Sequence, residues 1–281
     1  MQSNIIKELK GYSGCPLYLM NVNKNLIVRK VSASKDYNIR LQKQCLKQER
    51  FIKKGFITTP NVVERGYTLD GLYFFDMEYI KGQTFSNYLQ TCSIDDFLGR
   101  LKLLVNWCTS SSNMNRYRVE TKAIFIKKIN QLKFSISYFE NKATIFKFLD
   151  NVPWEKVPHS ICHGDLTVQN AIIYQDKIYL LDFLDSFYDS WMIDISKLLQ
   201  DLELGWTFRY EELSVETKLK MKIGSQYITD CLDNLSWGGA RYLVYSLLLL
   251  NILRIYPYCK DELTHKWIER STDYLLTKCL K

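Results

Sequence analysis

Residues 160–185, which read SICHGDLTVQNAIIYQDKIYLLDFLD, constrain the fold more than any other part of the chain. Two short apolar runs, Ala171–Tyr174 and Lys177–Leu181, flank a polar Gln-Asp turn and therefore predict a β-hairpin. A polar loop precedes the first run, and the second run ends at a carboxylate. The loop and hairpin together should hold three oxygen-bearing side chains, those of Asp165, Asn170 and Asp182.

These side chains suit phosphoryl transfer from ATP. A carboxylate such as Asp165 can orient an attacking hydroxyl and accept its proton. The oxygens of Asn170 and Asp182 are hard ligands of the kind that Mg²⁺ prefers when it bridges nucleotide phosphates. In protein kinases the base Asp stands five residues before a metal-binding Asn, and a second metal-binding Asp follows on a hairpin. The same spacing occurs here, with HGD in place of HRD and DFLD in place of DFG.

The combined pattern, H-G-D-x4-N followed by D-x-x-D, resembles that of the aminoglycoside phosphotransferase and choline kinase superfamily. The resemblance implies a protein-kinase-like fold, ATP and Mg²⁺ as cofactors, Asp165 as base, and Asn170 and Asp182 as Mg²⁺ ligands. Asp185, the fourth residue of the pattern, is assigned to the substrate side. We expect His163 to brace the loop rather than to catalyse. The alternative is a loop of capping residues, because Asp and Asn favour turns.

The order of the predicted elements gives an α+β fold with two lobes. Residues 1–80 should form a nucleotide-binding lobe, a small antiparallel sheet with one helix, and residues 81–281 a larger, mainly helical lobe with the catalytic loop and the acceptor site. A chain of 281 residues with 47% hydrophobic and 24% charged residues can bury such a core. The net charge of +8 is spread along helical stretches, so we do not expect nucleic-acid binding.

The cysteines and the apolar segments bear on location. The eight Cys are scattered without a CxxC or a Cys/His grouping, which argues against zinc and for free thiols in a reducing cytoplasm. The N-terminus lacks an apolar signal core. The most apolar run, Tyr242–Leu253, is too short to span a bilayer and predicts a buried helix. We therefore expect a cytoplasmic protein without a membrane span.

A glycine-containing turn precedes the strands Leu17–Val22 and Leu26–Val31. Its glycines would let backbone N–H groups approach phosphate oxygens, so Ser13 and Gly14 are candidate nucleotide contacts. An ordinary turn explains the same residues equally well. We expect the following strand, Leu26–Val31, to present a cation to the nucleotide.

The strand carries two cations, Arg29 and Lys30, on opposite faces. A kinase-like fold uses one strand-borne cation, held by a Glu of the next helix, and residues 34–53 predict that helix. Glu49 follows Lys30 by nineteen residues, which matches the kinase arrangement. We therefore assign Lys30 and Glu49 as the nucleotide-binding pair, with Arg29 as the alternative cation and a surface charge as the alternative role.

Beyond the strands Val62–Tyr67 and Leu72–Tyr79, the chain leaves the sheet at a Gly turn. The resemblance implies that the backbone groups of Glu78 and Ile80 contact adenine there, although a strand that simply ends describes the same residues. The remaining sequence is helical in pattern. Predicted helices cover residues 97–107, 116–149 (one or two helices), 195–204, 211–231, 237–255 and 262–280.

The acceptor should be a hydroxyl of a small molecule, either a sugar or an amino alcohol. Six residues that follow the hairpin are candidates to line its pocket, of which we favour Asp201, Trp206 and Arg209; the other three are Tyr188, Trp191 and Glu203. The segment also resembles phosphotransferase-family proteins of bacterial surface-polysaccharide gene clusters, which favours a glycan precursor. The resemblance further implies that Asp194 braces the catalytic loop.

Three other classes stay open. A protein kinase would need an activation segment, yet only eight residues separate Asp185 from Asp194. A catalytically silent nucleotide-binding module would not need the three oxygen-bearing side chains. A structural or interaction protein is hinted at only by the 19 Tyr residues. The sequence does not indicate the oligomeric state, or whether ATP or GTP is preferred.

Overall fold

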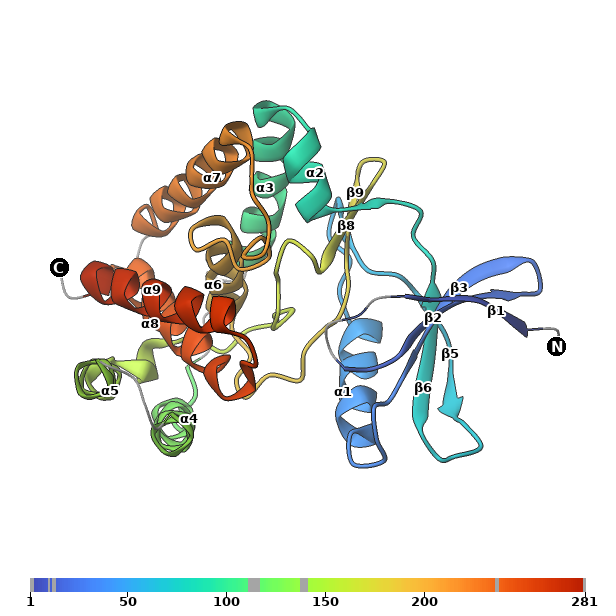
Figure 1. The fold of residues 1–281 in the computed structure, drawn as a ribbon, viewed down its shortest axis with the longest axis horizontal. Coiled ribbons are helices and arrows are strands. Elements are labelled where there is room, and N and C mark those ends of the chain that lie inside the picture. Colours follow the sequence, from blue (N-terminus) through green and yellow to red (C-terminus); the bar gives the residue numbers. More distant parts are fainter. Residues whose placement is uncertain are drawn as a thin grey trace. The chain divides into compact units, whose positions relative to one another are not determined.

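The computed structural model describes residues 3–9, 11, 14–110, 117–136, 141–235 and 238–279. The chain forms two compact units, the first of residues 1–85 with 170–185, and the second of residues 86–169 with 186–281. An antiparallel sheet lies in the N-terminal part, and the larger C-terminal part is mainly helical (Figure 1). This confirms the expected α+β fold class.

The first unit is built on a five-stranded antiparallel sheet with one helix, α1 (Asn38–Glu49), against its face (Figure 1). A two-residue turn at Asn23 and Lys24, both with positive φ, joins the second and third strands. Buried Leu41 and Cys45 of the helix form a core with aromatic residues of the sheet. The strands in spatial order are β1 (Ser3–Leu9), β2 (Leu17–Val22), β3 (Asn25–Val31), β6 (Tyr73–Glu78) and β5 (Val62–Tyr67).

A second, four-stranded sheet contains the predicted hairpin. Its strands in spatial order are β4 (Ile57–Thr58), β9 (Lys177–Leu180), β8 (Ala171–Tyr174) and β7 (Gln83–Thr84). Because a Cβ at Gly82 would lie 2.4 Å from the Ile173 carbonyl oxygen, only glycine allows the chain to approach β8 so closely. Pairing with β4 and β7 places the hairpin in the first unit, so the chain does not divide simply at residue 80.

The second unit is a set of helices. Serines at positions 93, 190 and 214 accept backbone N–H bonds at the starts of three of them, as N-cap residues do. Helix α6 thus begins four residues before the predicted start at residue 195. Residues 116–149 contain two helices rather than one, and residues 116, 137–140, 237 and 280 of the predicted helices lie outside the described part. The helices are α2 (Phe85–Thr91), α3 (Ile94–Thr109), α4 (Thr121–Ser135), α5 (Lys142–Asn151), α6 (Trp191–Leu202), α7 (Val215–Asp233), α8 (Ala240–Leu253) and α9 (Glu262–Cys279).

Helices α6 and α8 form the centre of this unit and pack against each other. Helix α8 is buried on nearly all sides, as its largely apolar sequence predicts. Gly224 of α7 permits a close approach to α3, because a Cβ there would lie 2.9 Å from Phe97. Among the described helices, none combines the length and the apolar character that crossing a membrane requires.

Candidate active site

The loop that carries Asp165 is held in shape by a buried carboxylate of α6. Asp194 accepts hydrogen bonds from the backbone N–H groups of His163 and Gly164, both at 2.7 Å. Gly164 has φ of 94°, a left-handed conformation that favours glycine. His163 is fully buried, and its Nδ1 accepts the Asp165 N–H at 3.2 Å. Asp194 and His163 therefore brace the loop, in the roles that we expected.

A second carboxylate of the same helix fixes the far end of the loop. Asp201 accepts hydrogen bonds from the backbone N–H groups of Val168 at 2.7 Å and Thr207 at 3.0 Å, and its side chain is fully buried. Burial raises the pKa of Asp201 to about 6, although the N–H bonds act in the opposite direction. The assignment of Asp201 to the acceptor pocket is therefore wrong, because both oxygens are used inside the protein.

Asp194 and Asp201, the two carboxylates of α6 that hold the loop, share one face of this helix. They are seven residues apart, about two turns, so their side chains point in nearly the same direction. Two acidic residues at this spacing in a mainly apolar helix indicate that both side chains contact the same neighbouring segment. The sequence contained this signal, and we did not use it when we assigned Asp201. The same face carries Lys197, three residues after Asp194, as a third polar group directed at the loop.

Asp165, the proposed base, is paired with Lys197. The Lys197 Nζ lies 3.1 Å from Asp165 Oδ1 and also donates to Gln200 Oε1 at 3.2 Å. Burial raises the pKa of Asp165, but the charge and hydrogen bond of Lys197, together with two further charges, outweigh burial and lower the pKa overall. His163 and Arg254 act electrostatically in the same direction as Lys197. The carboxylate is therefore kept ionised, and sequence reasoning missed the lysine that does this.

In the first unit, Lys30 reaches the hairpin. Its Nζ lies 2.7 Å from Asp182 Oδ1 and 3.4 Å from Gln44 Oε1, and the side chain is 2% exposed. Its neighbour Arg29 faces the other way and forms two 2.8 Å hydrogen bonds with Asp76. The alternation of strand side chains therefore directs Lys30, rather than Arg29, towards the oxygen-bearing residues.

The expected pair of Lys30 with Glu49 is wrong. The Glu49 carboxylate instead accepts a hydrogen bond from Arg65 at 2.7 Å. The residue of α1 that meets Lys30 is Gln44, five positions earlier, which corresponds to a rotation of about 140° around the helix. Residues 34–37 precede α1, which begins at Asn38, and the Asn38 side chain bonds the Gly71 carbonyl and the Tyr73 N–H at the start of β6. Counting residues from the strand did not reveal which helix face is buried.

Asp182 adopts an uncommon backbone conformation at the end of β9. Its φ is 59°, which is a left-handed value that costs energy for a residue other than glycine. The Leu181 N–H donates to the Asn170 carbonyl at 2.8 Å, so the backbone closes the hairpin beside both predicted metal ligands. Phe183 is buried against Phe51, with ring centroids 5.4 Å apart, as core packing predicts.

The residues after Asp182 are tied to α1. Lys47 Nζ donates to the Leu184 carbonyl at 3.0 Å, and Lys43 Nζ lies 3.4 Å from Asp185 Oδ2. Lys43 is 59% exposed and Asp185 35% exposed, so this second contact is open to solvent. The contacts with α1 position the segment that follows the hairpin. The substrate role of Asp185 stays a prediction.

Two backbone groups of the residues predicted to contact adenine form hydrogen bonds within the protein. The Glu78 N–H donates to the Asn61 carbonyl at 3.1 Å, and the Glu78 carboxylate also binds Asn61. The Ile80 carbonyl accepts the Gly82 N–H at 2.9 Å. The Glu78 N–H and the Ile80 carbonyl are therefore used within the protein, and the contact of either residue with adenine stays a prediction.

Of the two predicted phosphate contacts, Ser13 lies outside the described residues. Gly14 has φ of 73° and open space where a Cβ would stand. Glycine is needed there for its backbone conformation rather than for lack of room.

Trp206 and Arg209 lie in the connection between α6 and α7. The Trp206 ring packs on Trp267, with centroids 4.9 Å apart, and the Arg209 guanidinium stacks 3.7 Å above the Trp206 ring. Arg209 also donates to the Trp206 carbonyl at 2.9 Å and to Thr264 Oγ1 at 3.2 Å. Both side chains therefore tie this connection to α9, and their assignment to the acceptor stays a prediction.

Comparison with known proteins establishes the fold. No family model matches the chain, and no curated protein matches it in sequence. It is similar to the solved structure of a thermostable mutant of aminoglycoside phosphotransferase APH(4)-Ia in ternary complex with AMP-PNP and hygromycin B, with a TM-score of 0.65 and 10% identity. That match covers 96% of this chain and 92% of the other.

Two further structures give the same result. A mutant of aminoglycoside 2′-phosphotransferase-IIIa in its GDP complex has a TM-score of 0.57 at 15% identity, over 98% of this chain and 91% of the other. Choline kinase from Cryptosporidium parvum Iowa II has a TM-score of 0.56 at 12% identity, over 98% and 88%. The chain has the protein-kinase-like fold of these proteins, as its motifs predicted.

Proposed function

Because the chain has the fold of aminoglycoside phosphotransferases and choline kinase, we propose that it is an ATP- and Mg²⁺-dependent phosphotransferase. It moves the γ-phosphate of ATP to a hydroxyl of a small molecule. The observation that carries this proposal is the state of Asp165, which stands in a loop braced at both ends by α6 and is kept ionised by Lys197. A loop of ordinary capping residues does not need a charged carboxylate prepared in this way.

Asp165 is the group that orients the acceptor hydroxyl and takes its proton. A lowered pKa makes the carboxylate a weaker base, but it ensures that the base form is present at neutral pH. In a loose phosphoryl-transfer transition state the nucleophile needs alignment more than strong deprotonation. The rigid bracing of the loop by Asp194 and Asp201 serves that alignment.

The residues of the hairpin fit Mg²⁺. Asn170 and Asp182 supply one amide and one carboxylate oxygen, and Mg²⁺ in nucleotide sites is commonly held by one or two such protein ligands with the phosphates and water. Bound there, the ion would neutralise charge on the phosphates. Lys30, which is paired with Asp182, is the cation that would contact the phosphates when nucleotide binds.

For the acceptor we propose a sugar, in keeping with a surface-glycan precursor, rather than a cationic amino alcohol. Lys197 and Arg254 both contribute positive potential at Asp165. Like charges repel, so a cationic acceptor would be disfavoured beside this base, whereas a neutral or acidic sugar would not. The net charge of +8 acts in the same direction.

Calorimetric titration with ATP, with and without Mg²⁺, tests the nucleotide half of the proposal. Asp182→Ala should lose most of the Mg²⁺-dependent gain in ATP affinity, and Asn170→Ala should lose less, because only Asp182 carries a charge. Asp176→Ala, in the turn between β8 and β9, is the matched control. Equal Mg²⁺ dependence in wild type and Asp182→Ala would contradict the assignment.

A further inference from the structure

The second unit contains a cavity of about 540 Å³ lined by the end of α6, the connection that follows it, and helices α7, α8 and α9. Glu203 is the one acidic residue of its lining. The carboxylate of Glu203 accepts hydrogen bonds from the hydroxyl groups of Tyr245 and Tyr274, both at 2.6 Å. It is 10% exposed. The acid is therefore held within the wall of the cavity.

Four cations from three helices line the same cavity: Lys218, Lys222, Arg241 and Lys278. The two lysines of α7 are four residues apart on one helix face, an arrangement that is unfavourable for like charges. In the part of the chain that the structure describes, neither forms an ion pair. Arg241 pairs with exposed Asp233 at 2.9 Å, and Lys278 lies 4.0 Å from Glu203. The cavity therefore has an excess of positive charge.

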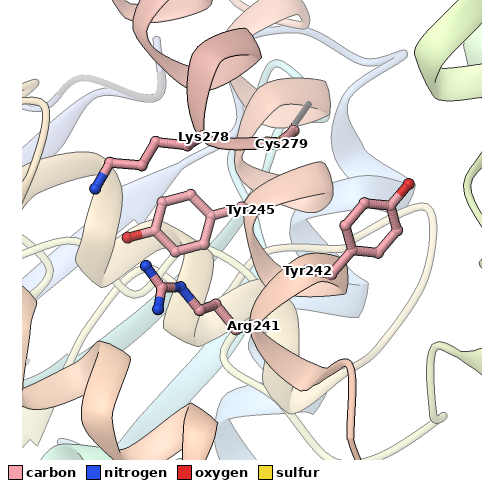
Figure 2. Close-up of a pocket in the computed structure, with 5 residues that line it drawn as sticks. All are labelled: Arg241, Tyr242, Tyr245, Lys278 and Cys279. Atoms are coloured by element: carbon pink, nitrogen blue, oxygen red, sulfur yellow. The ribbon is translucent and has the colours of Figure 1, made fainter. Parts of the chain in front are cut away.

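A smaller cavity of about 150 Å³ adjoins the first and shares Arg241, Tyr245 and Lys278 with it. Figure 2 shows the Tyr245 ring between the side chains of Lys278 and Arg241, with both charged ends extending towards the side of the Tyr245 hydroxyl. Tyr242 points to the opposite side of α8 (Figure 2). The cationic groups and a phenolic hydroxyl are thus gathered on one side of the helix.

We propose that this cavity binds a small phosphate-bearing ligand. Arginine and lysine together are the usual partners of phosphate, the first through its planar fork and the second as a point charge. The volume is within the range of about 300–1,000 Å³ that is typical of small-molecule pockets. Tyrosine and threonine side chains in the wall would contact the rest of such a ligand.

The site is separate from the residues of the proposed phosphotransfer reaction. All of its lining residues lie between positions 202 and 278, and none belongs to the loop and hairpin of residues 160–185. The proposal therefore does not depend on the phosphotransferase activity. A failure of either proposal would leave the other intact.

The test is calorimetric titration of the full chain with inorganic pyrophosphate in the absence of Mg²⁺, for wild type and for the double variant Lys218→Gln with Lys222→Gln. Wild type should bind pyrophosphate saturably. The double variant should bind at least about tenfold more weakly, because it removes two charged hydrogen-bond donors to the phosphate oxygens. The matched control, Lys142→Gln with Lys147→Gln on α5, removes the same charge elsewhere and should bind like wild type.

Three results would overturn the proposal. The first is no saturable binding of pyrophosphate by wild type. The second is equal affinity in wild type and the α7 double variant. The third is equal loss of affinity in both double variants, which would mean that net charge rather than this cavity attracts the anion. Circular dichroism of each variant shows whether the fold is retained, and retention is the expected result because none of the four lysines is buried.

Discussion

Lys197 Nζ lies 3.1 Å from Asp165 Oδ1, and the two side chains are only 12% and 33% exposed. The pair joins the catalytic loop to the helix that also braces it through Asp194 and Asp201. One face of α6 therefore fixes both the shape of the loop and the charge of its carboxylate. This relationship leads to the first prediction.

Replacing Lys197 with methionine should move the acidic limb of the pH–turnover profile to higher pH. Lys197 lowers the pKa of Asp165 against the opposing effect of burial, so its removal leaves burial to raise that pKa. The carboxylate then gains its proton at a higher pH as the solution is acidified, and the base form is lost earlier. Lys147→Met on α5 is the control. An unchanged acidic limb in Lys197→Met would show that the pair does not set the ionisation of Asp165.

The neighbouring cations of β3 should have separable effects. Lys30→Met should raise the KM for ATP, because it removes the buried ammonium beside Asp182. Arg29→Met should leave that KM unchanged but lower the free energy of unfolding by about 3 kcal/mol, because it leaves the carboxylate of Asp76 buried without its partner. Steady-state kinetics and denaturant unfolding of both variants check this. The reverse pattern would mean that Arg29 is the phosphate-contacting cation.

The helix partner of Lys30 should be Gln44 and not Glu49. Gln44→Leu removes a hydrogen-bond acceptor of Lys30 at nearly the same volume, and we expect the KM for ATP to rise by about tenfold, the effect of one hydrogen bond to a charged group worth about 1.5 kcal/mol. Glu49→Gln loses only a half-exposed ion pair with Arg65, so the KM should stay within error of wild type. A larger effect from Glu49→Gln would restore the pairing that the sequence suggested.

Asp194→Ala should loosen the catalytic loop. Two backbone N–H groups lose a charged acceptor inside the protein, and each such bond contributes about 1.5–3 kcal/mol. We therefore expect a fall of about 3 kcal/mol or more in the free energy of unfolding, measured in urea, together with a fall in kcat. Asp189→Ala, in the loop that precedes α6, is the comparison. Near-normal stability of Asp194→Ala would mean that the loop is held by other contacts.

The sequence was most informative where function and local structure use the same residues. The hairpin of residues 171–180 and the buried α8 could be predicted, because each depends on neighbours in the chain. The serine caps of α6 and α7 were not predicted. Strand alternation placed Lys30 and Arg29 on opposite faces, but the choice of Lys30 rested on its spacing from Glu49, a pair that the structure does not form.

Contacts between distant segments could not be predicted in the same way. The partner of Lys30 depends on which face of α1 is buried, and that face is set by the β5–β6 connection rather than by residue counting. Asp201 was assigned to substrate because it is acidic and follows the hairpin, whereas tertiary folding brings it beneath the backbone of Val168. Lys197 belongs to no recognised sequence motif. Its pairing with Asp165 is evident only from the distance between the two side chains in the folded structure.

The most direct test of the account is acceptor-dependent ADP release from ATP and Mg²⁺ with a panel of sugars and amino alcohols, comparing wild type with Asp165→Asn. We predict that wild type turns over with at least one sugar. Asp165→Asn should bind ATP normally but turn over about 10²–10⁴-fold more slowly, the usual effect of losing a general base. Wild-type rates in Asp165→Asn would contradict the central claim that this carboxylate, held by α6 and Lys197, receives the acceptor proton.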